Sequence, residues 1–125
     1  LFISGEIRCM DQEGYSMNVK ELSEALGLQQ VAAGSMEREV SGVYVCDLLS
    51  RVMSGCSAGD VWITVQTHLN TLAVAELCEA ACIILPEGIT AEPDTLKKAE
   101  EKGIDILSGD MTAYDLCWKI HQLMI

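Results

Sequence analysis

Residues 61–88, with the sequence VWITVQTHLNTLAVAELCEAACIILPEG, decide the fold class of this chain. Residues 61–67 alternate in the manner of a half-buried strand. After a polar turn, residues 72–79 are apolar on nearly every side, which favours a deeply buried helix. Residues 81–85 form a continuous apolar run, typical of a strand that is covered on both faces. The stretch therefore predicts one strand–helix–strand unit.

Two details of this unit can be predicted more closely. In the first strand, Val61, Ile63 and Val65 are expected to fall on one face. In the turn, Asn70 or Thr71 is expected to cap the helix, because their side-chain oxygens accept hydrogen bonds from the free N–H groups of a first turn.

The segments on both sides of the unit continue the alternation of helices and strands. Further helices are expected at residues 19–26, after Asp47, at residues 93–103 and after Thr112, and further strands at residues 29–33, 43–46 and 104–107.

Residues with capping side chains indicate where several of these helices begin. Asn18 and Thr112 each precede an acidic residue by three positions, which is the spacing of a capping box. Asp47 is expected to cap the helix that follows it, and that helix should direct Leu48, Leu49, Val52 and Met53 into the core.

The order of these elements predicts one α/β domain over residues 17–125. Strands that alternate with helices favour a three-layer α/β/α sandwich with a largely parallel central sheet of about five strands. Right-handed crossovers would place helices on both faces of that sheet.

Residues 1–16 differ from the rest of the chain, because they show no clear amphipathic period. Gln12-Glu13-Gly14 can be encoded by a purine-rich string that resembles a bacterial ribosome-binding site ahead of Met17. Our hypothesis is that residues 1–16 are a non-native leader. The alternative is an edge strand over residues 2–8.

The composition excludes some function classes. Nineteen acidic and eight basic residues give a net charge of −11, which disfavours binding to a nucleic acid polymer. No apolar run approaches the length of about 20 residues that spans a bilayer, so no membrane is expected as a partner. The first residues lack the features of a signal peptide, and we expect a cytoplasmic protein.

The six cysteines are expected to be reduced thiols. They form no C-x-x-C pair, and we predict neither a metal site nor a cofactor. Cys78 and Cys82 lie one helical turn apart in an apolar run, where thiols usually pack as small hydrophobic side chains.

The residues that could bind a ligand lie in loops that follow predicted strands. In a parallel sheet, ligands bind beyond the carboxyl ends of the strands. The loop at residues 66–70 offers Gln66, Thr67 and Asn70 for hydrogen bonds, and His68 for a charge that changes near neutral pH. Residues 86–92 form a second such loop. Asp110 and Thr112 belong to a third, although capping of helices would explain several of these side chains equally well.

Motifs of common catalytic machinery are absent. The chain contains neither a G-x-x-x-x-G-K-[ST] loop nor a G-x-G-x-x-G turn after a strand, and no G-x-S-x-G nucleophile elbow. We therefore predict no enzyme. Two alternatives stay open: an enzyme or phosphotransfer partner that uses His68 or Asp110, and a purely structural interaction domain.

Two segments resemble a known family. Residues 37–50, EREVSGVYVCDLLS, and residues 62–68, WITVQTH, resemble the DRTGG domain in its small stand-alone bacterial form, and the likeness covers residues 17–125. Arg38 and Gly42 match the naming residues of the family. Glu37 stands where the family prefers Asp, and Val43 where it commonly has a second Gly.

The resemblance implies a fold similar to the N-terminal domain of HPr kinase/phosphorylase, without that enzyme's catalytic domain. Family members lie between CBS domains in a regulatory pyrophosphatase and form dimer contacts there. Stand-alone relatives are associated with iron-only hydrogenase gene neighbourhoods. The resemblance thus implies a regulatory homodimer. It also implies that a hydrogenase-related protein could be a partner.

These observations together predict a non-catalytic regulatory module that senses a ligand and dimerises. We expect a small anionic metabolite or nucleotide to bind near Thr67, His68 and Asn70. Arg38 would be a charge partner for that ligand.

Overall fold

The computed structural model describes residues 17–125, and the expectations for residues 1–16 lie outside them. The helices are α2 (Val19–Leu26), α3 (Leu49–Gly55), α4 (Leu69–Cys78), α5 (Pro93–Lys102) and α6 (Ala113–Met124). The strands are β1 (Gln29–Ala32), β2 (Gly42–Val45), β3 (Asp60–Ile63), β4 (Cys82–Leu85) and β5 (Ile106–Ser108). No helix in this part of the chain is both long and apolar enough to cross a membrane.

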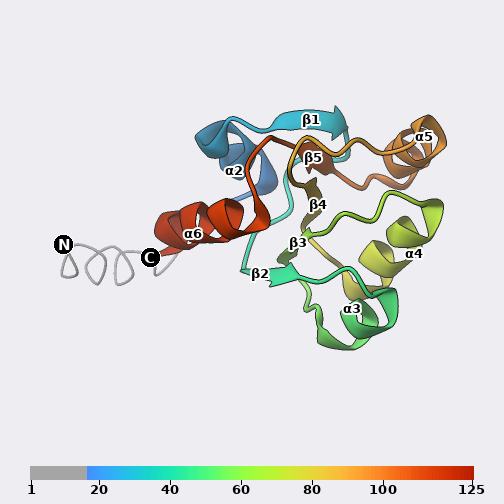
Figure 1. Ribbon diagram of the computed structural model, residues 1–125, viewed down its shortest axis with the longest axis horizontal. Helices are drawn as coiled ribbons and strands as arrows, with labels where there is room; N and C mark the ends of the chain where they lie inside the picture. Colours follow the sequence, from blue (N-terminus) through green and yellow to red (C-terminus); the bar gives the residue numbers. More distant parts are fainter. Residues whose placement is uncertain (1–16) are drawn as a thin grey trace.

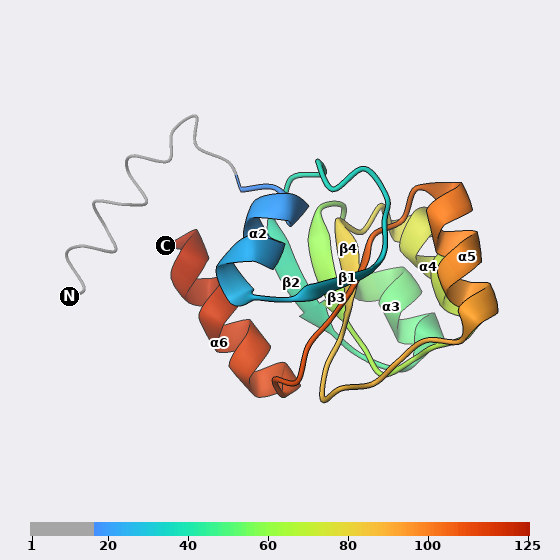
Figure 2. The same cartoon turned by 90° about the horizontal axis from the view of Figure 1, so that it is seen from above.

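The strands form one sheet with the order β1-β5-β4-β3-β2. Strands β2 to β5 are parallel to one another, and β1 pairs antiparallel with β5 at one edge. The crossover helices α3, α4 and α5 cover one face, whereas α2 and α6 cover the other (Figures 1 and 2). This arrangement confirms the predicted three-layer α/β/α sandwich with a largely parallel sheet.

Each face of the sheet has its own apolar cluster. On one face, Ile84 of β4 belongs to the cluster that includes Leu22 of α2 and Leu116 of α6. On the other face, Ile83 belongs to the cluster that includes Leu72 of α4. All positions of β4 are buried, as predicted for a strand covered on both faces. Full burial of one such side chain contributes about 1.5–3 kcal/mol.

Two predicted helix caps are confirmed. The Asn18 side chain accepts a hydrogen bond from Glu21 N at 2.8 Å, and Glu21 Oε1 accepts one from Asn18 N at 3.0 Å, so both halves of the capping box form. Thr112 Oγ1 accepts a hydrogen bond from Asp115 N at 3.1 Å and caps α6.

The prediction that Asp47 caps α3 is wrong. The N-cap of α3 is Leu48, which makes no side-chain capping bond. Asp47 Oδ1 instead accepts hydrogen bonds from Thr64 Oγ1 and Val65 N across the loop after β3. Of the four residues predicted to face inward, Val52 is buried and Leu49 packs against the same apolar cluster, whereas Leu48 and Met53 are exposed. The tertiary partners of Asp47 therefore outcompete the local cap.

The predicted strand at residues 61–67 is too long, and the predicted start of α4 is too late. β3 ends at Ile63, and Val65 is exposed, because its amide bonds to Asp47 instead of extending the sheet. α4 begins at Leu69 with His68 as its N-cap. Asn70 and Thr71 thus lie inside the first turn, where they cannot be the cap.

Candidate functional site

The carboxyl ends of β2 to β5 lie along one edge of the sheet because these strands are parallel. The loops that follow them cover residues 46–48, 64–68, 86–92 and 109–112. Hydrogen bonds join these loops: Thr95 Oγ1, from the first turn of α5, donates to Thr67 O at 2.9 Å, and Glu87 N donates to Met111 O at 2.9 Å. The three loops predicted from the sequence therefore share one edge, called the carboxyl rim below, and the loop after β2 joins them.

Asp47 ties the loop after β2 to the loop after β3. Its Oδ1 accepts from Thr64 Oγ1 at 2.8 Å and from Val65 N at 2.9 Å. Gln66 Nε2 donates to the backbone oxygen of Asp47 at 2.6 Å, and Gln66 N donates to Thr64 Oγ1 at 3.2 Å. Gln66 is thus at the rim, as predicted, but its amide nitrogen already holds the neighbouring loop.

The start of α4 has polar groups that no side chain caps. His68, its N-cap, makes no side-chain capping bond, so no capping side chain satisfies the first-turn N–H groups. His68 Nδ1 lies 3.6 Å from Glu92 Oε2, and both side chains are more than half exposed, so the pair is weak. Within the described part of the chain, Thr71 Oγ1 in the same turn is buried without a hydrogen-bond partner.

Asp110 and Thr112 lie at the same rim but at the start of α6, which covers the other face of the sheet. The Thr112 hydroxyl is used as the cap of α6. Asp110 is exposed beside Gly88, close enough that a Cβ atom on Gly88 would lie 3.4 Å from Asp110 Oδ1. The loop at residues 86–92 stands between these residues and His68.

Apolar side chains accompany the polar groups at the β2–β3 end of the rim. Val45, Leu48, Val65 and Leu69 are each at least 45% exposed. Leu48 and Val65 flank the Asp47 network, and Leu69 is the first residue of α4. An apolar surface thus adjoins the polar loop at residues 64–68.

The structure does not bring Arg38 to the carboxyl rim. Arg38 Nη1 donates to the backbone oxygen of Gly103, the C-cap of α5, at 2.8 Å. His68 contacts Glu92, the N-cap of the same helix. A helix of this length spans roughly 15 Å, so Arg38 and His68 lie at opposite edges of the domain.

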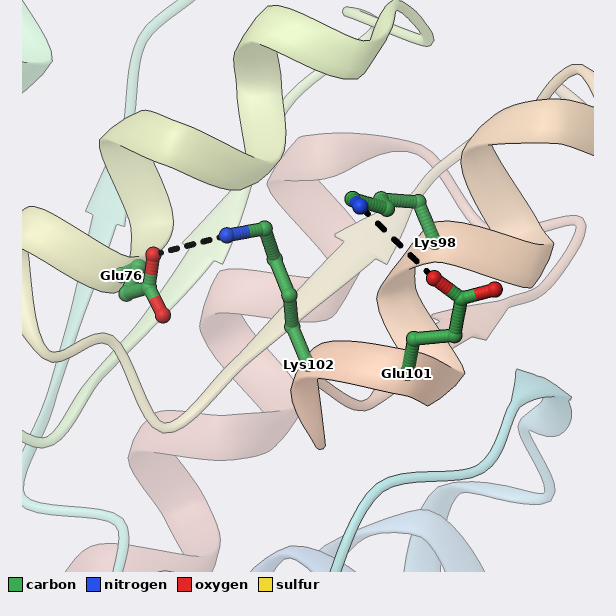
Figure 3. A network of polar contacts seen from close by, with 4 residues as sticks. All are labelled: Glu76, Lys98, Glu101 and Lys102. Carbon is green, nitrogen blue, oxygen red and sulfur yellow. Dashed lines mark hydrogen bonds and ion pairs between the residues drawn. The ribbon is translucent and has the colours of Figure 1, made fainter.

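Arg38 lines a cavity of about 240 Å³ at that opposite edge, together with Glu79, Cys82 and Lys102. Lys102 Nζ lies 3.1 Å from Glu76 Oε1 of α4, so an ion pair bridges α4 and α5 there (Figure 3). Burial and the nearby Asp105 carboxylate raise the pKa of the Cys82 thiol, and the Arg38 guanidinium lowers it. The cations near this cavity are therefore engaged with acids and with a helix C-terminus.

Sequence reasoning missed the roles of Asp47, Thr64, Glu92 and Thr95 at the rim. A signal for Asp47 was present, since it follows a strand predicted at residues 43–46, and the carboxyl-end rule applies to that strand as well. Glu92 and Thr95 gave no such signal, because their contacts with residues 67–68 depend on how α5 packs beside α4.

Among the comparisons with known proteins, the one with solved structures found a similar fold. No protein-family model and no curated protein matches the chain. A solved structure that resembles it is that of the CBS and DRTGG domains of the regulatory region of Clostridium perfringens pyrophosphatase, complexed with the activator diadenosine tetraphosphate. The TM-score is 0.68 at 15% sequence identity, and the match covers 84% of this chain and 46% of that one.

The chain thus spans about half the length of the solved structure that it resembles, at 46% coverage. At this level of identity the likeness concerns the fold, and it supports a DRTGG-like fold.

Proposed function

We propose that this chain is a non-enzymatic regulatory module that binds a nucleotide at the carboxyl rim. The observation that carries the proposal is the meeting of a polar helix start, at His68 and Asn70, with exposed Leu48, Val65 and Leu69 on the same rim. Small-molecule sites combine apolar surface with a few polar groups, and in parallel sheets they lie beyond the carboxyl ends of the strands.

The apolar side chains at the rim favour a nucleotide over a simple anion. Asp47 and Glu92 contact the polar loop at residues 64–68, and their carboxylates oppose a small free anion. A nucleotide gains additional free energy because its base covers apolar surface, at about 25 cal/mol per Å² of apolar area removed from water. Its phosphate would meet the first-turn N–H groups of α4 and the His68 imidazole.

The solved structure with a similar fold gives this proposal independent support, because that regulatory region holds diadenosine tetraphosphate, a nucleotide activator. The hydrogenase-related partner and the cytoplasmic location expected from the sequence stay predictions. Arg38 is not part of the proposed site, since it lies at the opposite edge.

The test is isothermal titration of the full chain with AMP, ATP and diadenosine tetraphosphate, with inorganic phosphate as the comparison. We expect at least one nucleotide to bind more tightly than phosphate. His68→Ala combined with Asn70→Ala should weaken binding at least tenfold, as should Leu69→Ser. Arg38→Ala is the matched control and should leave the affinity unchanged.

The proposal fails if no nucleotide binds, or if Arg38→Ala weakens binding as much as the rim variants do. Incubation with ATP or acetyl phosphate, followed by measurement of the intact mass, distinguishes nucleotide binding from the alternative of phosphotransfer. A phosphorylated His68 or Asp110 would establish a phosphotransfer partner instead.

We also propose that the module forms a homodimer through its β2 and α6 side. β2 is an edge strand with Val45 about half exposed, and α6 packs beside it. One helical turn apart on α6, Tyr114 is 72% exposed and Trp118 is 48% exposed. Open strand edges and exposed aromatic side chains are features of surfaces that associate, and a two-fold dimer would pair this surface with itself.

Light scattering across a concentration series tests the dimer. The unmodified chain should have twice the mass of one chain, and Trp118→Glu should shift it to the monomer. Leu77→Glu, at an exposed apolar position of α4, is the control and should stay dimeric. A monomer at all concentrations would refute this surface as an interface.

A further inference from the structure

Two cysteine thiols meet where the C-terminal ends of α3 and α4 lie together. Cys56 is the C-cap of α3, and Cys78 is the last residue of α4. Both converge on one backbone oxygen: Cys56 N donates to Val52 O at 2.9 Å, and Cys78 Sγ donates to the same oxygen at 3.4 Å. The Cys78 thiol therefore lies beside the backbone of Cys56, whose own thiol donates to Ser57 O at 3.9 Å.

We propose that Cys56 and Cys78 form a reversible intrachain disulfide that links α3 to α4. The partner reagent is a low-molecular-weight disulfide of the glutathione class. Both cysteines are free and partly exposed, so the reagent can reach the pair.

The reaction proceeds by two thiol–disulfide exchanges. The Cys78 thiolate attacks the external disulfide, forms a mixed disulfide and releases one thiolate. The Cys56 thiolate then attacks the sulfur of Cys78, forms the Cys56–Cys78 bond and releases the second thiolate. In balance, the protein loses two thiol hydrogens and two electrons, and the reagent is reduced to two thiols.

The positions of the other described cysteines distinguish this pair. Cys46 Sγ donates to the backbone oxygen of Leu48 in the loop after β2. Cys82 is buried in the sheet, and Cys117 lies on α6, against the opposite apolar cluster. The sequence showed no sign of the pair, because Cys56 and Cys78 belong to different helices and match no spacing motif.

The surroundings of Cys56 make the second exchange the slow one. Burial, the Asp60 carboxylate and the Cys78 thiol raise the pKa of Cys56 to about 12. Little thiolate is therefore present near neutral pH, and closure should accelerate as the pH rises. Asp60→Asn removes the negative neighbour and should speed closure several-fold at fixed pH.

The experiment treats the full chain with oxidised glutathione at pH 8 and follows intact mass and non-reducing peptide maps. We expect a product that has lost two hydrogen atoms, in which the peptides of Cys56 and Cys78 are joined and separate again with a reducing agent. Cys56→Ser should stop at the glutathione adduct on Cys78. Cys46→Ser is the matched control and should close at the unmodified rate.

Three results would overturn the proposal: joined peptides from other cysteines, no joined product, or closure that persists in both Cys56→Ser and Cys78→Ser. Serine at position 78 keeps a hydroxyl that can donate to Val52 O, and Cys56 bonds to that oxygen through its backbone N–H, so both variants should fold. Circular dichroism checks this before oxidation.

Discussion

At the scale of single residues, Asp105 has the most constrained environment among the described acids. Its side chain is fully buried. Oδ1 accepts a hydrogen bond from Gly34 N at 2.6 Å, and Oδ2 accepts one from Met36 N at 2.9 Å. Met36 has a positive φ of 61°, and a side chain at position 34 would collide with the backbone of Gly103. Asp105 therefore fixes the loop that carries Arg38.

We predict that Asp105→Asn lowers the free energy of unfolding by roughly 1.5–3 kcal/mol, the range for hydrogen bonds to charged groups. The amide keeps one acceptor and turns a donor toward a backbone N–H. Urea unfolding provides the measurement. Glu100→Gln is the matched control, since Glu100 Oε2 accepts from Ala33 N of the same loop at an exposed position. Its effect should stay below about 0.5 kcal/mol, and equal losses would contradict the role of burial.

Three thiols with raised pKa values predict a loss of stability at alkaline pH. Burial, then the Asp60 carboxylate and the Cys78 thiol, raise the pKa of Cys56 to about 12, and burial is the main cause that raises the pKa of Cys82 and Cys117 above 9.0. Above pH 9 the unfolded chain releases these protons and the folded chain keeps them. The free energy of unfolding therefore stays level below that pH, as far as thiols are concerned, and falls above it.

Urea unfolding between pH 7 and about pH 10.5 under reducing conditions measures this loss. Cys82→Ala should be less stable throughout, because it leaves a small cavity, but its stability should fall less steeply above pH 9. Curves that run parallel for the two proteins would show that Cys82 does not contribute.

Asp105 also shows which residue-scale features could not be predicted. Its partners are 71 and 69 positions away in the sequence, and the residue itself falls inside a predicted strand. By contrast, the Asn18–Glu21 capping box was predictable because both partners lie within one helical turn.

At the scale of elements, the loops after β2 and β3 form one unit through Asp47 and Thr64. Both side chains belong to a single network that includes the amides of Val65 and Gln66. The local sequence suggested a helix cap at Asp47, and three-dimensional contacts gave the carboxylate better partners. This is why the helix starts near the rim were less predictable than the helices themselves.

We predict that Asp47→Ala and Thr64→Val each destabilise the fold by roughly 1–3 kcal/mol, because each leaves a polar partner without its bond. Their effects should not add. A double-mutant cycle measured by urea unfolding should give a coupling energy of about 0.5–3 kcal/mol, since the residues share one hydrogen bond. Additive losses would mean that the two loops are held by other contacts.

At the scale of the whole molecule, the periodicity of apolar residues was sufficient to predict the fold class. It was not sufficient to predict which residues meet at the site. Alternating strands and helices indicate a parallel sheet wherever they occur, and the strand order β5-β4-β3-β2 follows the chain without reversal. Arg38 was misplaced because the connection from β1 to β2 crosses the sheet at the amino ends of β2 to β5. Residues 33–41 come before the strand predicted at residues 43–46, so the rule for the carboxyl ends of strands did not apply to them.

The central strand β4 provides the test of the two-sided core. Ile83 and Ile84 point to opposite apolar clusters, and both are almost completely buried. A charge at either position cannot reach solvent, and its burial costs several kcal/mol or more. That cost is comparable with the total stability of about 5–15 kcal/mol that is typical of a domain.

We therefore predict that Ile84→Asp abolishes the cooperative unfolding transition. Ile84→Val should retain it with a loss of about 0.5–1.5 kcal/mol, because it removes one methyl group and leaves a small cavity. Circular dichroism during urea titration distinguishes the two variants. A cooperative transition in Ile84→Asp would mean that β4 is reached by water, in which case α2 and α6 could not cover the sheet as they do in Figure 2.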